Sequence, residues 1–157
     1  MKTRERTWLF AAVTAVALVA GLGSQAAAQV GTSQGVVDAN TAGEADLAAM
    51  PHMTPAIAKA LVETRPFASV TELNAFLLGQ GLSLEEATTF YRRAFVHVDL
   101  NSATSEEILI IPGAGRRMAR EFKEYRPWKT KEQFFKEIGK YVDEKEVARL
   151  WRFVVIQ

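Results

Sequence analysis

A Pro-Gly-x-Gly turn followed by two arginines is the segment whose residue types best suit chemistry. It spans residues 112–115, and Arg116 and Arg117 come directly after it. Glycines permit a sharp bend with positive φ and leave the amides of the turn uncovered. Together with the free N–H groups of a following helix, such amides form a positive concavity that suits a phosphate. The segment therefore predicts an anion-binding hairpin between two helices, which Ala119 allows to approach closely.

Residues suited to catalysis or metal binding are missing from the sequence. There is no cysteine, and the two histidines, His52 and His97, have no partner at a spacing typical of metal ligands. No carboxylate cluster and no nucleophile with a base occurs outside expected helix caps and solvated faces. Asp38 and Asp99 are expected to hydrogen-bond the backbone just after them. We therefore expect a protein that is not an enzyme and that has no cofactor and no small-molecule substrate.

An internal repeat organises the chain. The segment VDANTA at 37–42 recurs as VDLNSA at 98–103. At the same spacing, Glu-x-Arg-Pro occurs at 63–66 and again at 124–127. Toward the end the spacing shortens by one position, as in the pairs Glu86 with Glu146, Tyr91 with Trp151 and Arg92 with Arg152. This register predicts a duplication, with a first copy at 37–97 and a second copy at 98–157.

Each copy is expected to consist of short helices joined by tight turns. Capping boxes are predicted to start helices at Ser69, Ser83, Thr130 and Asp143, and prolines at 66 and 127 to end them. Apolar residues recur at helical spacing after the caps. The segment FVHVDL at 95–100, the best strand candidate, is interpreted as a helix end and the junction between copies. The aromatic residues are interpreted as core rather than as stacking platforms for bases.

In these motifs the chain resembles the helix-hairpin-helix family, and within it the exported ComEA-like competence DNA receptors. The resemblance rests on VDLNSATSEEILIIPGAG and covers about residues 37–157 in two copies. It implies an all-α fold of tandem paired hairpins, with second hairpins at 78–82 and 138–142, and sequence-independent binding to double-stranded DNA. The phosphate-binding residues implied by position are Gly113, Ala114, Gly115, Arg116 and Arg117, with Arg120 and Lys123 as helpers by proximity.

The first copy departs from this pattern. Its hairpin has His52 and Thr54 where glycines are expected, and no basic residue follows before Lys59. One intact hairpin predicts weak, salt-sensitive binding. Decayed hairpins also occur in the extrinsic PsbU family of photosystem II, which the chain resembles in type and which binds protein. An alternative function is therefore that of a structural or interaction subunit of a membrane or envelope complex.

Residues 1–28 have the pattern of a secretory signal peptide. A basic start is followed by an apolar stretch from about Trp8 to Gly21, which is short for a membrane span, and by small residues that end at Ala28. Cleavage after Ala28 predicts a periplasmic or secreted protein that begins with a flexible lead at 29–36, and the less favoured alternative is a retained membrane anchor. The remaining chain carries 4 basic and 7 acidic residues at 29–97, but 12 basic and 10 acidic residues at 98–157. Attraction for a polyanion is therefore expected in the second copy.

Overall fold

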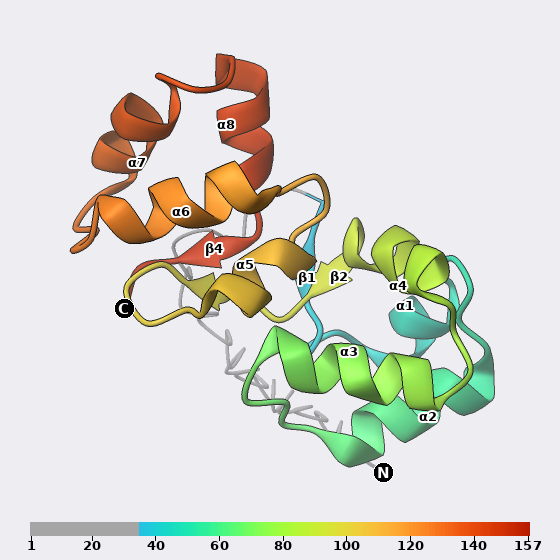
Figure 1. Cartoon of the computed structure of the whole chain (residues 1–157). Coiled ribbons are helices and arrows are strands. Elements are labelled where there is room, and N and C mark those ends of the chain that lie inside the picture. Colours follow the sequence, from blue (N-terminus) through green and yellow to red (C-terminus); the bar gives the residue numbers. More distant parts are fainter. Residues whose placement is uncertain (1–34) are drawn as a thin grey trace, which may run out of the picture.

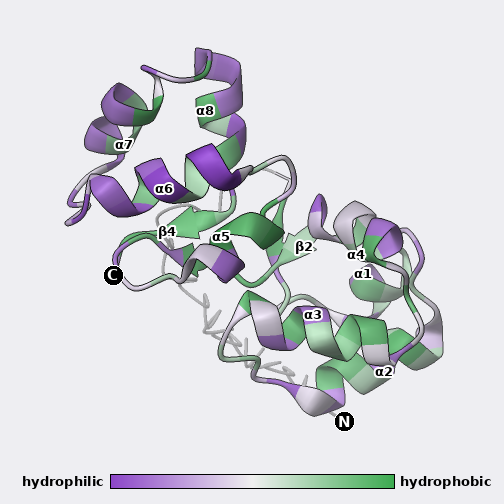
Figure 2. Ribbon diagram, viewed as in Figure 1, coloured by the Kyte–Doolittle hydropathy of each residue, from purple (hydrophilic) through white to green (hydrophobic). Residues whose placement is uncertain are grey.

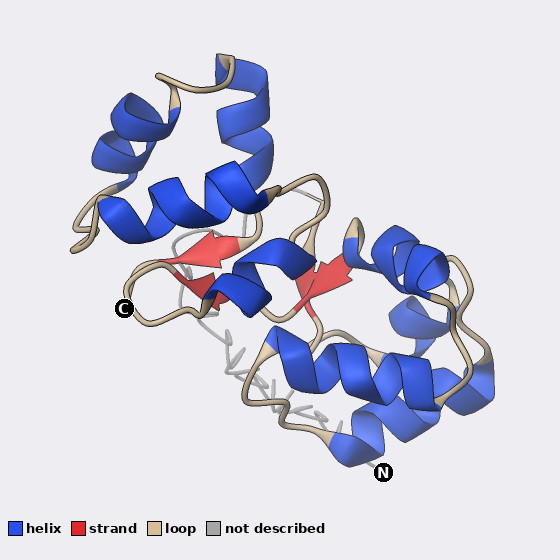
Figure 3. Cartoon of the chain, in the orientation of Figure 1, coloured by secondary structure: helices blue, strands red, loops and turns tan. Residues whose placement is uncertain are grey.

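The computed structural model describes residues 35–157, in which the same order of elements occurs twice (Figures 1 and 3). The predicted signal peptide and most of the predicted lead lie outside the described residues. The first copy contains β1 (Val37–Asp38), α1 (Glu44–Ala48), α2 (Pro55–Thr64), α3 (Val70–Gly79), α4 (Leu84–Tyr91) and β2 (Ala94–Phe95). The second contains β3 (Val98–Asp99), α5 (Ser105–Ile110), α6 (Arg116–Glu124), α7 (Lys131–Ile138), α8 (Glu144–Trp151) and β4 (Val154–Val155). The described chain is thus mostly helical, as predicted.

Two short parallel strand pairs join the beginning of each copy to its end. Val37 of β1 lies opposite Ala94 of β2, and Val98 of β3 lies opposite Val154 of β4. The interpretation of residues 95–100 as a helix end was wrong, because α4 already ends at Tyr91 and the segment contains parts of β2 and β3. Each strand is so short that it shows no alternation that a sequence pattern could reveal.

The predicted helix caps are present, and one further cap is found. The side chains of Ser69, Ser83, Thr130 and Asp143 each accept a hydrogen bond from the backbone N–H three residues later. A complete capping box, with both reciprocal bonds, occurs at Ser83 and also at Thr104, where no cap was predicted. These caps set where α4 and α5 begin, since they satisfy amides that the helix itself leaves free.

The repeated Glu-x-Arg-Pro segments hold each copy together. Arg65 donates to the carbonyl of Ala42, while Arg126 donates to the carbonyls of both Leu100 and Ala103. Two asparagine side chains join the same regions. Each donates to the backbone carbonyl and accepts from the backbone N–H of one distant residue, which is Phe67 for Asn40 and Trp128 for Asn101. These side chains fix the segment before the first helix of each copy against the end of its second helix.

The aromatic residues form the core, as predicted, and the core runs through both copies. Phe95 of the first copy meets Phe153 of the second edge to face, with ring centroids 5.2 Å apart. Helix α3 also contacts α5, which brings the copies side by side (Figure 1). Hydrophilic residues cover much of α6, α7 and α8 (Figure 2). Within residues 35–157, no helix has both the length and the apolar character needed to span a membrane.

Candidate nucleic-acid interface

The turn at residues 112–115 has the sharp bend that its glycines predict. Gly113 has φ +83°, a conformation that L side chains rarely adopt. The amide of Ala114 donates to the carbonyl of Ile111 at 2.9 Å, and Ala114 is buried. The prediction that Ala114 offers a free amide was therefore wrong. The bend that leaves Gly113 and Gly115 exposed directs the N–H of Ala114 into a hydrogen bond at the end of the preceding helix.

The amides that follow the turn are open. Gly115 is the N-cap of α6 and has no side chain to cap the helix. The first helical hydrogen bond runs from Ala119 to the carbonyl of Gly115, and the amides of residues 115–118 donate to no other group in the described part of the chain. Four such N–H groups at a helix start carry a partial positive charge and can donate to an anionic oxygen.

The basic residues around this helix start lie on two different sides of α6. The guanidinium of Arg117 stacks over the ring of Tyr141, 4.9 Å from its centroid. The hydroxyl of Tyr141 lies 2.8 Å from that of Tyr125, and this hydrogen bond raises the pKa of Tyr141, so its ring stays neutral. Arg117 is thereby held beside the helix start by a residue of the segment 138–142. No signal in the sequence predicted this contact beyond the placing of Tyr141 in that segment.

The other basic residues of α6 face a groove against α5. Arg116, Arg120 and Lys123 all line this groove. Arg120 forms an ion pair with the buried Glu121 at 2.8 Å, which lowers the pKa of Glu121, and Lys123 donates to the hydroxyl of Ser105 at 3.0 Å. Arg116 is exposed and has no ion pair within residues 35–157. The expected binding set is thus divided: Arg116 and Arg117 flank the open amides, whereas Arg120 and Lys123 lie farther along α6 and already have partners.

The hairpin of the first copy follows the same backbone course but offers fewer free amides to an anion. His52 has φ +62°, like Gly113, and the amide of Met53 donates to the carbonyl of Met50. Thr54 caps α2 by accepting from the amide of Ile57 at 3.2 Å, where Gly115 leaves the equivalent amide free. Pro55 has no N–H at all. Thr54 and Pro55 have therefore removed two of the four donors, while the turn itself persists.

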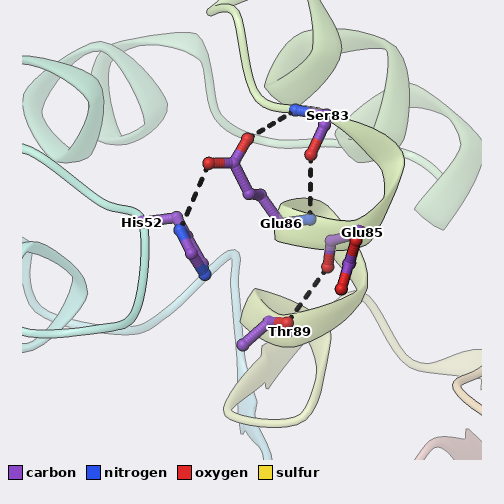
Figure 4. A network of polar contacts seen from close by, with 5 residues as sticks. All are labelled: His52, Ser83, Glu85, Glu86 and Thr89. Carbon is purple, nitrogen blue, oxygen red and sulfur yellow. Dashed lines mark hydrogen bonds and ion pairs between the residues drawn. The ribbon is translucent and has the colours of Figure 1, made fainter.

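Different residues fill the space beside the two turns. In the first copy the His52 ring reaches Glu86, with Nδ1 3.3 Å from Oε1 (Figure 4). In the second copy a Cβ on Gly113 would lie 2.8 Å from Nη2 of Arg149. The glycine thus leaves room for Arg149, which forms a two-point ion pair with Glu146 at 2.7 Å for each bond. Glu86 and Glu146 occupy equivalent positions of the two copies, and each has a nitrogen-bearing partner. The partner of Glu86 comes from the turn, whereas the partner of Glu146 comes from α8 itself.

A known motif can now be assigned to the first of these turns. Residues 32–78 match the family model of the helix-hairpin-helix motif. Motifs of this kind commonly bind DNA. Within the described residues the match runs from β1 into α3 and includes the turn between α1 and α2, and the second copy repeats this order of elements. Neither the comparison with curated proteins nor that with solved structures finds a match.

The two histidines lie apart from any site for a metal. Within the part of the chain that the structure describes, no group of three or more His, Cys, Asp or Glu side chains could hold an ion. His52 is a surface turn residue, as predicted, and His97 lies at the junction between the copies. Asp38 and Asp99 accept hydrogen bonds from Asn40 and Asn101, which is the local role that the sequence predicted for them.

Proposed function

We propose that this protein is not an enzyme and binds double-stranded DNA without reading its sequence, through the start of α6. The observation that carries the proposal is the run of four unbonded amides at residues 115–118 beside the guanidinium groups of Arg116 and Arg117. Backbone N–H groups and arginines bind phosphate oxygens, which carry no sequence information themselves. The N-terminal pole of the helix adds to the attraction.

The binding should be weak and sensitive to salt. Only the second of the two Pro-initiated hairpins keeps all four amides at its helix start unbonded, so few phosphates are neutralised. The logarithm of the affinity should fall with the logarithm of the salt concentration with a slope of about two to four. Arg120 and Lys123 contribute less to this slope in the proposal, because each already has a partner.

Charge reversal at the helix start tests this mechanism. Arg116→Glu combined with Arg117→Glu should abolish binding to a labelled duplex in an anisotropy titration. The variant should still fold, since acidic residues suit the first turn of a helix. Lys59→Glu, on an exposed face of the first copy, is the control and should change binding little. Duplex binding that ignores salt, or that survives the double change, would contradict the proposal.

A location outside the cytoplasm is part of the proposal. The resemblance to ComEA-like exported receptors and the pattern of residues 1–28 together support a periplasmic or secreted protein. Expression of the full chain followed by mass spectrometry of the periplasmic fraction should find a product that begins at Gln29. A product that keeps its first residues and stays with the membrane would contradict this part of the proposal.

A second candidate function is that of a protein-binding subunit of a membrane or envelope complex. The loss of donors from the hairpin of the first copy favours it, as does Leu84 at the start of α4, which is 66% exposed. This candidate predicts that the protein co-purifies with a complex from native membranes and fails to shift a duplex. A pull-down and a DNA shift assay on the same preparation separate the two functions.

A further inference from the structure

A second basic site lies at the boundary between the two copies. It is a cavity of about 420 Å³ whose lining includes Arg92, Arg149 and Arg152. Its wall includes residues 112–113, the first part of the open turn. Arg92 follows α4 and Arg152 follows α8, so these two arginines occupy equivalent positions of the repeat. The cavity thus brings the corresponding ends of both copies to one place.

The charges of this cavity are unbalanced. Arg149 is neutralised by its two-point ion pair with Glu146. Arg92 and Arg152 form no ion pair with any residue in the range 35–157, and Glu146 is the only acid that lines the cavity there. Among the residues that the structure describes, these two positive charges therefore have no counter-charge. Arginine, with its planar set of donors, suits a phosphate oxygen better than any other side chain.

The cavity is continuous with the hairpin. Gly113 contributes to its wall, and the open amides begin two residues later at Gly115, at most about 7 Å along the chain. The cavity also depends on the glycine, because a Cβ there would displace Arg149. The first copy has His52 at this position and Thr89 in place of Arg149, so it has no counterpart of this arrangement.

We propose that this cavity holds a second phosphate of the same DNA strand whose neighbouring phosphate lies on the amides at the start of α6. The proposal rests on the proposed function and extends it, since it makes residues of both copies part of a single DNA-binding surface. A site with Arg92 from one copy and Arg152 from the other requires that the copies stay fixed against each other, as the contact between Phe95 and Phe153 provides.

Paired alanine variants test this site. Arg92→Ala with Arg152→Ala should weaken binding to a labelled 20-base-pair duplex by roughly tenfold at about 50 mM KCl, and should lower the salt slope by about one. The matched control is Arg93→Ala with Lys145→Ala, which removes two exposed positive charges from neighbouring positions that do not line the cavity. The control should lose far less affinity and keep the wild-type slope.

Three results distinguish the outcomes. If the cavity variant and its control behave alike while Arg116→Glu/Arg117→Glu loses binding, the cavity is not a phosphate site, although the proposed function stands. If the wild type fails to bind the duplex, or the hairpin variant binds as well as the wild type, the proposed function fails and the cavity proposal fails with it. If the cavity variant does not fold, Arg92→Gln against Arg93→Gln gives the same comparison, since both side chains are exposed.

Discussion

Four arginines of this protein show two contrasting kinds of surroundings. Arg65 and Arg126, the most regular feature of the repeat, donate to backbone carbonyls inside their own copies. Burial lowers the pKa of both guanidinium groups, yet each stays charged because its ordinary value is so high. Arg116 and Arg117, by contrast, are exposed at an open helix start. A count of basic residues along the sequence cannot separate these groups, because only the partners differ.

Removing a structural arginine should therefore affect stability and leave DNA binding intact. Arg126→Ala leaves two carbonyls without their donor and should cost about 2–3 kcal/mol of unfolding free energy. Arg65→Ala loses one such bond and should cost less, about 1–2 kcal/mol. Urea unfolding measures both changes. Duplex affinity measured well below the unfolding midpoint should match the wild type, and a loss of affinity in a folded Arg126→Ala variant would place this residue at the interface instead.

His97 should make stability fall on mild acidification. Within residues 35–157, neither of its buried ring nitrogens has a well-formed hydrogen bond, and burial lowers its pKa although Asp38 and the nearby backbone of Arg152 favour the charged form. A histidine whose pKa is lower in the folded state binds more protons when unfolded, so stability is full above the unfolded pKa, about 6.5, and decreases as the pH falls below it.

The comparison with His97→Gln isolates this effect. Between pH 7.5 and 5.5, the wild type should lose more unfolding free energy than the variant, as measured by urea titrations at each pH. Parallel pH profiles for the wild type and His97→Gln would show that the buried ring is not responsible.

At the scale of elements, the sequence predicted the helices better than it predicted their open ends. Four helix starts were predicted correctly from one local pattern. In this pattern a residue with a hydroxyl or carboxylate side chain stands three residues before one with an acid or amide side chain. The strands could not be recognised, since each depends on a partner at the opposite end of its copy. The hydrogen bond that closes the amide of Ala114 also escaped prediction, because it depends on the backbone course of the turn rather than on any side chain.

The two hairpins offer a direct exchange of donors, because their backbones agree and their residues differ. Gly115→Thr should cap one amide at the start of α6 in the second copy, as Thr54 caps the amide of Ile57 in the first copy, without any change in net charge. The new side chain has room, since nothing lies within 4 Å of a Cβ there and φ is negative. Duplex affinity should fall several-fold while the helix is slightly stabilised, by a few tenths of a kcal/mol. Unchanged affinity in anisotropy titrations would mean that these amides do not bind the phosphate.

The reverse exchange should open the first hairpin. His52→Gly, Thr54→Gly and Pro55→Arg together restore the free amides and one arginine, and should raise the salt slope by about one. His52→Gly alone is the control, because it relieves the positive φ of 62° without freeing a donor. Loss of the Thr54 cap should cost about 1 kcal/mol of stability at most. A triple variant that folds but binds the duplex no better than the control would contradict the assignment of the donors.

At the scale of the whole molecule, the shared core decides whether the copies act together. The strand pairs close each copy on itself, which alone would allow two independent units. Phe95 and Phe153, however, are both almost fully buried and lie in edge-to-face contact across the boundary. Apolar burial of this kind makes each copy part of the other's environment, and we therefore expect cooperative unfolding of both.

Calorimetry tests this expectation. The wild type should unfold in one transition whose calorimetric enthalpy equals the van't Hoff enthalpy. Phe153→Ala should lower the unfolding free energy by about 3–5 kcal/mol, since it removes a large side chain from the core. Because the cavity at Arg92 and Arg152 lies across the same boundary, this variant should also lose duplex affinity where it remains folded. Two separate transitions in the wild type would instead show that the copies are independent, and the DNA-binding surface would then be confined to the second copy.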